Sequence, residues 1–193
     1  FIRDYSLQNS NKVILIIHGL GEHSGRYLKL IQDFNDKNIS VFTIDIRGHG
    51  KSEGKRGHSP FYQQLMNDIQ CFIEHVTKKI PDQKYFLYGH SFGGNLVINY
   101  SFQENKKING IIATSPLIKP SIAPSRIVLF MGKLFKKIVP SLILSNGINI
   151  NGISRNMQVI NDYINDPLIH NKVSVQLGLD IISSGIYALE NSQ

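Results

Sequence analysis

The sequence predicts an α/β protein with a mostly parallel sheet and helices on both of its faces. Two observations support this: buried-strand patterns alternate with helical patterns through residues 1–116, and short glycine-containing loops join them. Strand–helix–strand units of this kind are right-handed and place their strands parallel. Functional residues in such sheets lie at the carboxyl ends of the strands, so we expect the site there.

Four strands are expected, because uninterrupted apolar and β-branched runs are typical of strands buried on both faces. They cover residues 13–17, 40–45, 85–88 and 108–114. Apolar residues recur at helical spacing from Tyr27 to Phe34, from Phe61 to Ile80 and from residue 95 to residue 100. Ser59 and Pro60 are expected to cap and open the second of these helices.

The pattern changes after Pro116, where prolines recur and no strand is expected. Residues 127–144 are apolar but carry Lys133, Lys136 and Lys137, too many charges for a transmembrane helix. We expect a helix that covers a site or touches a membrane surface, or one that packs on its own domain. The predicted division is a core at 1–116, a cap at 117–168 and a helix at 169–193 that returns to the core, with the remainder of the core absent.

The composition is that of a globular protein, with 41% hydrophobic and 18% charged residues among 193. The net charge is +7, but the lysines are scattered and no nucleic-acid-binding motif is present, so we expect no nucleic-acid partner. The single cysteine, Cys71, cannot form an internal disulfide and is expected to be a small buried residue. With no signal peptide visible, we expect a cytoplasmic protein, with membrane association through the cap as a further expectation.

The strongest motif follows the strand at residues 85–88. Gly89-His90-Ser91-Phe92-Gly93 fits G-x-S-x-G, the sharp strand-to-helix turn that exposes a nucleophilic serine. Side chains at Gly89 or Gly93 would collide with the neighbouring chain, so both positions favour glycine. The alternative is a structural glycine-rich turn, which the position between a strand and a helix makes the weaker interpretation.

Three long motifs in register resemble the monoacylglycerol lipase and lysophospholipase branch of the α/β-hydrolase family. Residues 18–27 read HGLGEHSGRY, residues 45–54 read DIRGHGKSEG and residues 89–94 read GHSFGG. Ile153-Ser154-Arg155, with Tyr163 and Asp166-Pro167-Leu168, is similar to the segment that closes the cap in that branch. Asn156 and Met157 depart from the Asp-Pro of many relatives. The resemblance covers nearly the whole chain.

The resemblance implies an α/β-hydrolase fold and a serine hydrolase that cleaves esters of single-chain lipids. Ser91 would form an acyl-enzyme, and the backbone N–H groups of Leu20 and Phe92 would hold the oxyanion. The alcohol end of the pocket would be shaped by polar side chains, namely Glu22, His23, Arg26 and Tyr163. The acyl chain would run under the cap, and no metal or organic cofactor is expected.

The residues themselves leave alternatives open. His18 and His49 can order their loops rather than react, Asp45 can bind loop amides, and Glu22 can pair with Arg26 four positions later. The alternative functions are a short-chain esterase, a peptidase-like hydrolase and a non-catalytic member that binds an acyl ligand. The intact serine motif argues against the last, and the apolar run at 127–144 favours a lipid chain.

A nucleophilic serine needs a histidine base that is oriented by a carboxylate, and in this fold both follow the serine on later loops. After Ser91 the chain has one histidine, His170, with Asp162 and Asp166 shortly before it. We reject this trio, because its members are too close in sequence to come from separate strand ends. We therefore expect these residues to be part of a longer hydrolase whose acid and base follow residue 193.

Overall fold

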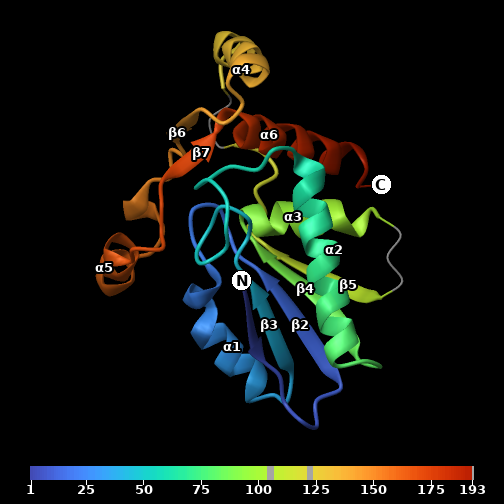
Figure 1. Cartoon of the computed structure of the whole chain (residues 1–193). Helices are drawn as coiled ribbons and strands as arrows, with labels where there is room; N and C mark the ends of the chain where they lie inside the picture. The colour runs from blue at the N-terminus through green and yellow to red at the C-terminus, as the bar shows by residue number, and fades with distance from the viewer. Residues whose placement is uncertain (104–106, 121–123, 193) are drawn as a thin grey trace.

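The computed structural model describes residues 1–103, 107–120 and 124–192, and its centre is a five-stranded sheet (Figure 1). The strand order is β1-β3-β2-β4-β5; β1 pairs antiparallel with β3 and the other neighbours are parallel. The mostly parallel sheet is therefore confirmed. The strands are β1 (Ile2–Tyr5), β2 (Lys12–Ile17), β3 (Ser40–Ile44), β4 (Lys84–His90) and β5 (Ile108–Thr114).

Helices cover both faces of the sheet, as the uninterrupted apolar strands predict. Alternate residues of β2 divide between two cores: Val13, Leu15 and Ile17 face one, and Ile14 and Ile16 face the other. The first core is closed by α2 (Tyr62–Lys79), α3 (Phe92–Ser101) and α6 (Val175–Glu190). The second is closed by α1 (Leu28–Asn35), with the 3-10 turn η1 (Ser24–Tyr27) before it.

Several expectations for the core are wrong in detail. Strand β1 was not anticipated, because its mixed residues Ile-Arg-Asp-Tyr carry no apolar run. Helix α2 begins at Tyr62 rather than at Pro60, and Ser59 donates its hydroxyl to the Phe61 carbonyl instead of capping the helix. Cys71 is exposed on the outer side of α2, not buried.

The segment after Pro116 contains both helices and strands, so the expectation that no strand would follow is wrong. Its elements are α4 (Arg126–Ile138), β6 (Ile143–Ser145), the 3-10 turn η2 (Ile150–Gly152), α5 (Met157–Asn165) and β7 (Lys172–Ser174). Strands β6 and β7 form a small antiparallel sheet. The helix expected over 127–144 ends at Ile138, two residues before Pro140. The last helix starts at Val175, within the expected range 169–193, because Ser174 caps it.

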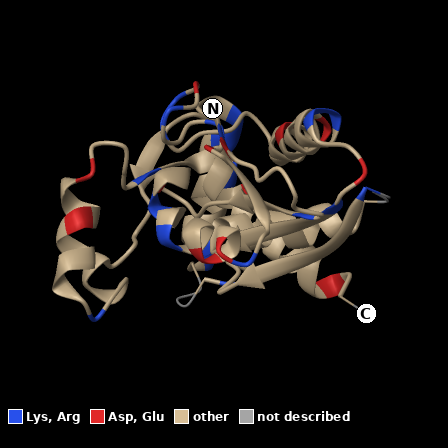
Figure 2. Ribbon diagram, turned by 90° about the horizontal axis from the view of Figure 1, so that it is seen from below, with Lys and Arg blue, Asp and Glu red and all other residues tan. Residues whose placement is uncertain are grey.

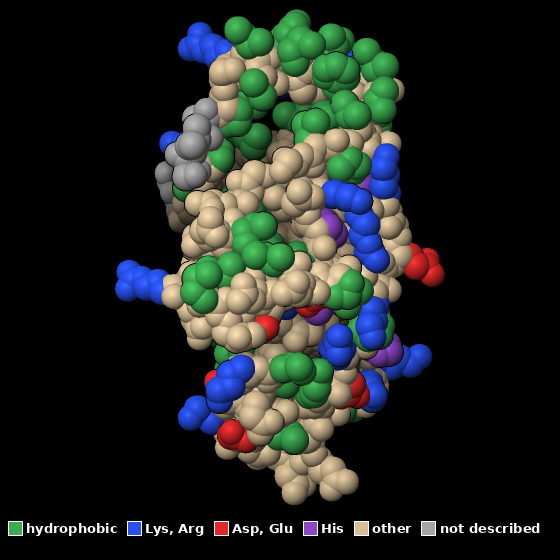
Figure 3. All heavy atoms as spheres, turned by 90° about the vertical axis from the view of Figure 1, so that its left-hand side faces the viewer, with side chains coloured by type: hydrophobic (Ala, Val, Ile, Leu, Met, Phe, Trp, Pro, Cys, Tyr) green, Lys and Arg blue, Asp and Glu red, His purple; other side chains and the backbone are tan. Residues whose placement is uncertain are grey.

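Helix α4 lies at the outer end of the molecule and is attached to it through α6 (Figure 1). The Lys136 ammonium binds the Asp180 carboxylate at 3.0 Å, and Gly132 faces the Leu179 side chain. None of the α4 residues is buried, and Ile127 and Phe130 are 76% and 68% exposed. The apolar side chains at the top of Figure 3 mark this end of the molecule. The boundaries 117–168 for a cap remain a prediction.

Charged groups show no single basic stripe, since Lys and Arg spread over several elements (Figure 2). In the described part of the chain, no helix combines the length and apolarity needed to cross a membrane.

Candidate active site

Ser91 stands between β4 and α3 in a strained backbone conformation, with φ 53° and ψ −114°. Few non-glycine residues adopt positive φ, and the strain is maintained by the packing of two glycines. A Cβ on Gly89 would lie 2.2 Å from the Gly93 carbonyl oxygen, and one on Gly93 would lie 2.1 Å from that of Ile17. The sharp turn predicted from G-x-S-x-G is therefore present, and Ser91 remains partly exposed.

The loop after β2 lies against this turn. A Cβ built on Gly19 would be 3.3 Å from the Ser91 Cβ, so the loop passes directly beside the serine. Among the described residues, neither the Leu20 N–H nor the Phe92 N–H donates a hydrogen bond within the chain. Phe92 opens α3, whose first N–H groups have no intrahelical acceptor and favour negative charge. Two unpaired backbone donors thus flank Ser91.

Glu22 holds the same loop in place. Its Oε1 atom accepts hydrogen bonds from the Gly19 N–H and the Tyr27 hydroxyl, each at 2.7 Å. Its Oε2 atom accepts from Arg26 Nε at 3.1 Å, which confirms the pairing across four residues. Burial, with the nearby Glu22 charge, raises the pKa of Tyr27 above its ordinary value, so this phenol stays protonated and donates.

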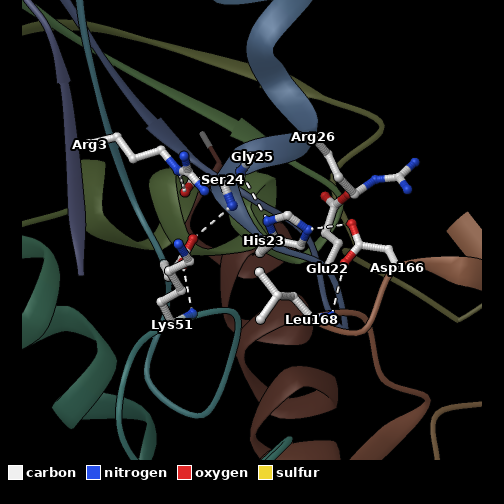
Figure 4. Close-up of polar contacts among 10 residues, drawn as sticks. Arg3, Glu22, His23, Ser24, Gly25, Arg26, Lys51, Asp166 and Leu168 are labelled. Atoms are coloured by element: carbon white, nitrogen blue, oxygen red, sulfur yellow. Dashed lines mark hydrogen bonds and ion pairs between the residues drawn. The ribbon is translucent and has the colours of Figure 1, made fainter. Parts of the chain in front are cut away.

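His23 connects this loop to the segment that follows α5 (Figure 4). Its Nδ1 atom accepts from the Gly25 N–H, so the proton resides on Nε2, which donates to Asp166 Oδ2 at 2.7 Å. Burial raises the pKa of Asp166, but the bonds from His23 and the Leu168 N–H outweigh it and hold that pKa below its ordinary value. This link joins residues 143 positions apart, and no sequence pattern indicates it.

Arg26 and Tyr163 meet beside this link. The Arg26 guanidinium carbon lies 4.7 Å from the centre of the Tyr163 ring, a cation–π contact. Burial raises the pKa of Tyr163, so its hydroxyl is protonated and can donate. The structure therefore brings Glu22, His23, Arg26 and Tyr163 together at the edge of the loop that carries Leu20.

Asp45 orders the neighbouring loop, as one interpretation of its position predicted. Its carboxylate accepts from the Ser24 N–H and the Lys51 N–H, each at 2.8 Å. Burial raises the pKa of Asp45, yet these bonds outweigh it and hold the pKa below its ordinary value. Asp45 thus fixes the backbone on both sides of the site.

Three histidines form a row under the loops, with ring centres 5.4 Å apart for His18 and His49 and 4.7 Å for His49 and His170. His18 Nε2 accepts from the Ile46 N–H, so its Nδ1 proton is donated to the Gly19 carbonyl at 2.8 Å. Burial lowers the pKa of His18. Burial also lowers the pKa of His49 well below its ordinary value, and the neighbouring His18 lowers it further. These neutral rings order the loops, which supports the interpretation of His18 and His49 as structural.

His170 does not serve Ser91. Its Nε2 atom contacts the Gly48 carbonyl at 3.1 Å, and its Nδ1 atom accepts from the Lys172 N–H. Asp166 binds His23, while Asp162 accepts from Gln158. The rejection of this trio is consistent with these contacts. Within the ranges described, no group of three or more His, Cys, Asp or Glu side chains is arranged to hold a metal ion.

Comparison with known proteins agrees with this geometry. A sequence profile of the family described as serine aminopeptidase, S33, matches residues 8–193. The chain belongs to this α/β-hydrolase family. The crystal structure of Paleococcus ferrophilus monoacylglycerol lipase matches 98% of the chain and 71% of its own length, with a TM-score of 0.87 and 36% identity. The α/β-hydrolase fold predicted from the motifs is thereby confirmed.

Two curated relatives have names that describe lipid hydrolysis. Monoglyceride lipase from Rattus norvegicus is 34% identical over 89% of this chain, and Phospholipase YtpA from Bacillus subtilis is 34% identical over 85%. The chain spans 57% of the rat protein and 63% of the bacterial one. The recognised resemblance to monoacylglycerol lipases and lipid hydrolases is confirmed, while the activity of the whole protein is a matter for proposal.

Proposed function

We propose that this chain belongs to a serine hydrolase that cleaves carboxylic esters of single-chain lipids, monoacylglycerols or lysophospholipids, through an acyl-enzyme on Ser91. The observation that carries the proposal is a strained, partly exposed serine flanked by the unpaired N–H groups of Leu20 and Phe92. A protein that merely bound an acyl ligand would have no need to maintain that strain. The lipid-hydrolase names of its relatives support the same chemistry.

In the proposed mechanism the Ser91 oxygen attacks the ester carbonyl, and the oxyanion that forms accepts hydrogen bonds from Leu20 and Phe92. A histidine base must take the serine proton and return it to the departing alcohol. In the described structure no imidazole is hydrogen-bonded to Ser91, so the proposal assigns the base and its carboxylate to a part of the full-length protein outside residues 1–193. Water then cleaves the acyl-enzyme.

The alcohol end of the substrate is proposed to meet the group formed by Glu22, His23, Arg26 and Tyr163. Glu22 and His23 are already engaged by the loops, so their contribution is to hold Leu20 in position. Arg26 keeps guanidinium N–H groups beyond its Nε bond to Glu22, and Tyr163 keeps its hydroxyl proton, so both can donate to hydroxyl oxygens of the substrate.

The acyl chain is proposed to lie under the cap. The protein is proposed to be cytoplasmic, and helix α4 of the cap is proposed to contact a membrane surface as well. The exposed apolar side chains of α4 support this. Replacing Phe130 and Leu134 by Asp should reduce hydrolysis of long-chain esters much more than that of short soluble esters. The matched control replaces Leu28 and Phe61, which are 54% and 50% exposed on the core. Equal losses on both ester classes would count against a substrate-contacting cap.

A peptidase is a second candidate, because the family is described as serine aminopeptidase. The full-length protein should be assayed on glycerol esters, phosphocholine esters, short-chain esters and aminoacyl amides, with Ser91→Ala as the blank. We expect fastest turnover of the long single-chain lipid esters and none by the variant. Preference for aminoacyl amides would replace the proposal with the peptidase, and preference for short esters would replace it with a general esterase.

A further inference from the structure

A pocket with both polar and apolar walls lies beside the loop that carries Leu20. It is a cavity of about 430 Å³ between the stretch after β6, the end of α5 and residues 166–172. Its walls include the apolar side chains of Ile148, Ile150 and Ile164, and its polar lining includes Arg56 and Lys172. Figure 3 shows the face that carries α5, β6 and β7, where Lys and Arg side chains gather beside histidines along one edge.

The two cations of this pocket are not neutralised. In the described ranges, the ion pairs involve other basic side chains, and Arg56 contacts only the Ser52 carbonyl, at 3.4 Å. Both cations lie close to His170: burial lowers its pKa, and the charges of Arg56 and Lys172 lower it further. The carboxylate in the lining, Asp166, is already engaged by His23 and the Leu168 N–H.

A buried donor lies between this pocket and the loop that carries Leu20. The side-chain nitrogen of Asn146 is buried and has no hydrogen-bond partner among the described residues. A Cβ built on Gly21 would lie 3.0 Å from this nitrogen, so Asn146 sits directly over the residue that follows Leu20. Because this nitrogen is shielded from solvent, Asn146 forms part of the wall between the pocket and that loop, and the two cations are the groups that fit an anionic ligand.

We propose that Arg56 and Lys172 bind the phosphate group of a single-chain phospholipid. The inference rests on the proposed function and narrows its substrate class. A phosphate offers several acceptor oxygens, which suit the guanidinium fork of Arg56 and the ammonium of Lys172 together. The apolar walls suit the carbon chain of an amphiphile, and Tyr163 and Asp166, which also line the pocket, place it beside the proposed alcohol end of the substrate. A neutral monoacylglycerol would leave both cations without a partner.

The test measures binding of oleoyl lysophosphatidic acid, monooleoylglycerol and inorganic phosphate to the full-length protein, below the micelle concentration. Arg56→Gln and Lys172→Gln should each weaken lysophosphatidic acid binding about tenfold, the loss expected for one charge-assisted hydrogen bond. Monooleoylglycerol binding should change by less than about twofold, since it carries no charge to lose. Lys84→Gln, an exposed lysine at the amino end of β4, is the matched control and should bind as the wild type does.

Equal lysophosphatidic acid affinity in the wild type and both variants, or an equal loss in Lys84→Gln, would overturn the inference. If inorganic phosphate binds as tightly as lysophosphatidic acid, the inference that the bound phosphate belongs to a lipid is refuted. Thermal unfolding of each variant shows whether a loss reflects folding, and Arg56→Lys should then recover part of the affinity. Arg56-dependent binding in a protein that hydrolyses no lipid ester would support the site while refuting the proposed function, so the two failures are distinguishable.

Discussion

The turn around Ser91 and helix α4 are built on opposite principles. At the turn, main-chain atoms of Gly93 and Ile17 are so close that a single added carbon has no space, and Phe92 and Leu96 are fully buried behind it. In α4 no residue is buried, and the helix is attached through Lys136 and the small face at Gly132. The chain therefore fixes the turn at Ser91 by close packing and leaves helix α4 without a buried residue.

This contrast suits the proposed chemistry. An oxyanion site must hold its donors in place before the reaction, because donors that have to reorganise stabilise the transition state less. A surface that admits long apolar chains instead needs exposed apolar side chains that can adapt. Matched substitutions in the two regions test this contrast.

The largest difference is expected between two Gly→Ala variants. Gly93→Ala should lower the free energy of unfolding by about 4 kcal/mol, because its methyl group meets the carbonyl oxygens of Ile17 and His18 at 2.1 and 2.6 Å. Gly132→Ala should raise it by about 0.5–1 kcal/mol, because alanine favours a helix and its methyl group meets the Leu179 side chain at an ordinary 3.5 Å. Urea denaturation of both measures the two effects, and a tolerated Gly93→Ala would contradict the packing described for the turn.

Two Leu→Ala variants compare the packing of the sheet core with that of helix α4. Leu15 is fully buried in β2, so Leu15→Ala should lower the free energy of unfolding by about 3 kcal/mol. Leu134 in α4 is 44% exposed, and Leu134→Ala should change that free energy by about 0.5 kcal/mol. Chemical denaturation of both proteins checks this. Similar losses at the two positions would mean that α4 packs as firmly as the core.

The order of the elements was predictable because burial on both faces imposes a continuous apolar pattern. Residues 13–17 show this pattern and are buried in β2, whereas residues 108–114 form the edge strand β5, in which no residue is buried. The short strands β6 and β7 were missed, since three residues carry no periodicity and their pairing joins distant segments. Cys71 was placed wrongly because it lies within the apolar helical pattern of α2, but on its exposed side.

The site divides in the same way. The turn at Ser91 was predictable because it depends on neighbours within five residues, where glycine and serine are needed for local geometry. The bond from the Gly19 N–H to Glu22 spans three residues, yet nothing in the sequence distinguishes it from the pairing of Glu22 with Arg26. The bonds from His23 to Asp166 and from the His170 N–H to the Gly21 carbonyl depend on how the segment after Pro116 folds back, which one sequence does not reveal.

The smallest expected effect is what one buried histidine adds to the pH dependence of stability, and it belongs to the region around Ser91. The pKa values of His18, His49 and His170 lie below the ordinary 6.5, burial being the main cause. Below pH 6.5 the unfolded chain binds protons that the folded chain does not, so the folded state is fully favoured above 6.5 and loses stability as the pH falls. Each such histidine contributes a slope of up to about 1.4 kcal/mol per pH unit.

Denaturation between pH 7.5 and 5.5 measures this slope. His49→Gln should reduce the slope by up to about 1.4 kcal/mol per pH unit, the contribution of one proton, because the folded protein then holds one fewer neutral buried ring. His75→Gln, at an exposed histidine of α2, should leave the slope as it is in the wild type. A wild-type slope of zero would show that His18, His49 and His170 bind protons without lowering the free energy of unfolding.

The most direct test of the account is covalent labelling of the full-length protein by a fluorophosphonate, followed by mass spectrometry of its peptides. We expect one modified residue, Ser91, because the strained turn exposes this hydroxyl beside the N–H groups of Leu20 and Phe92. Ser91→Ala should remain folded, take up no label and hydrolyse no lipid ester. Label on another serine, or undiminished hydrolysis by Ser91→Ala, would contradict the assignment of Ser91 as the nucleophile.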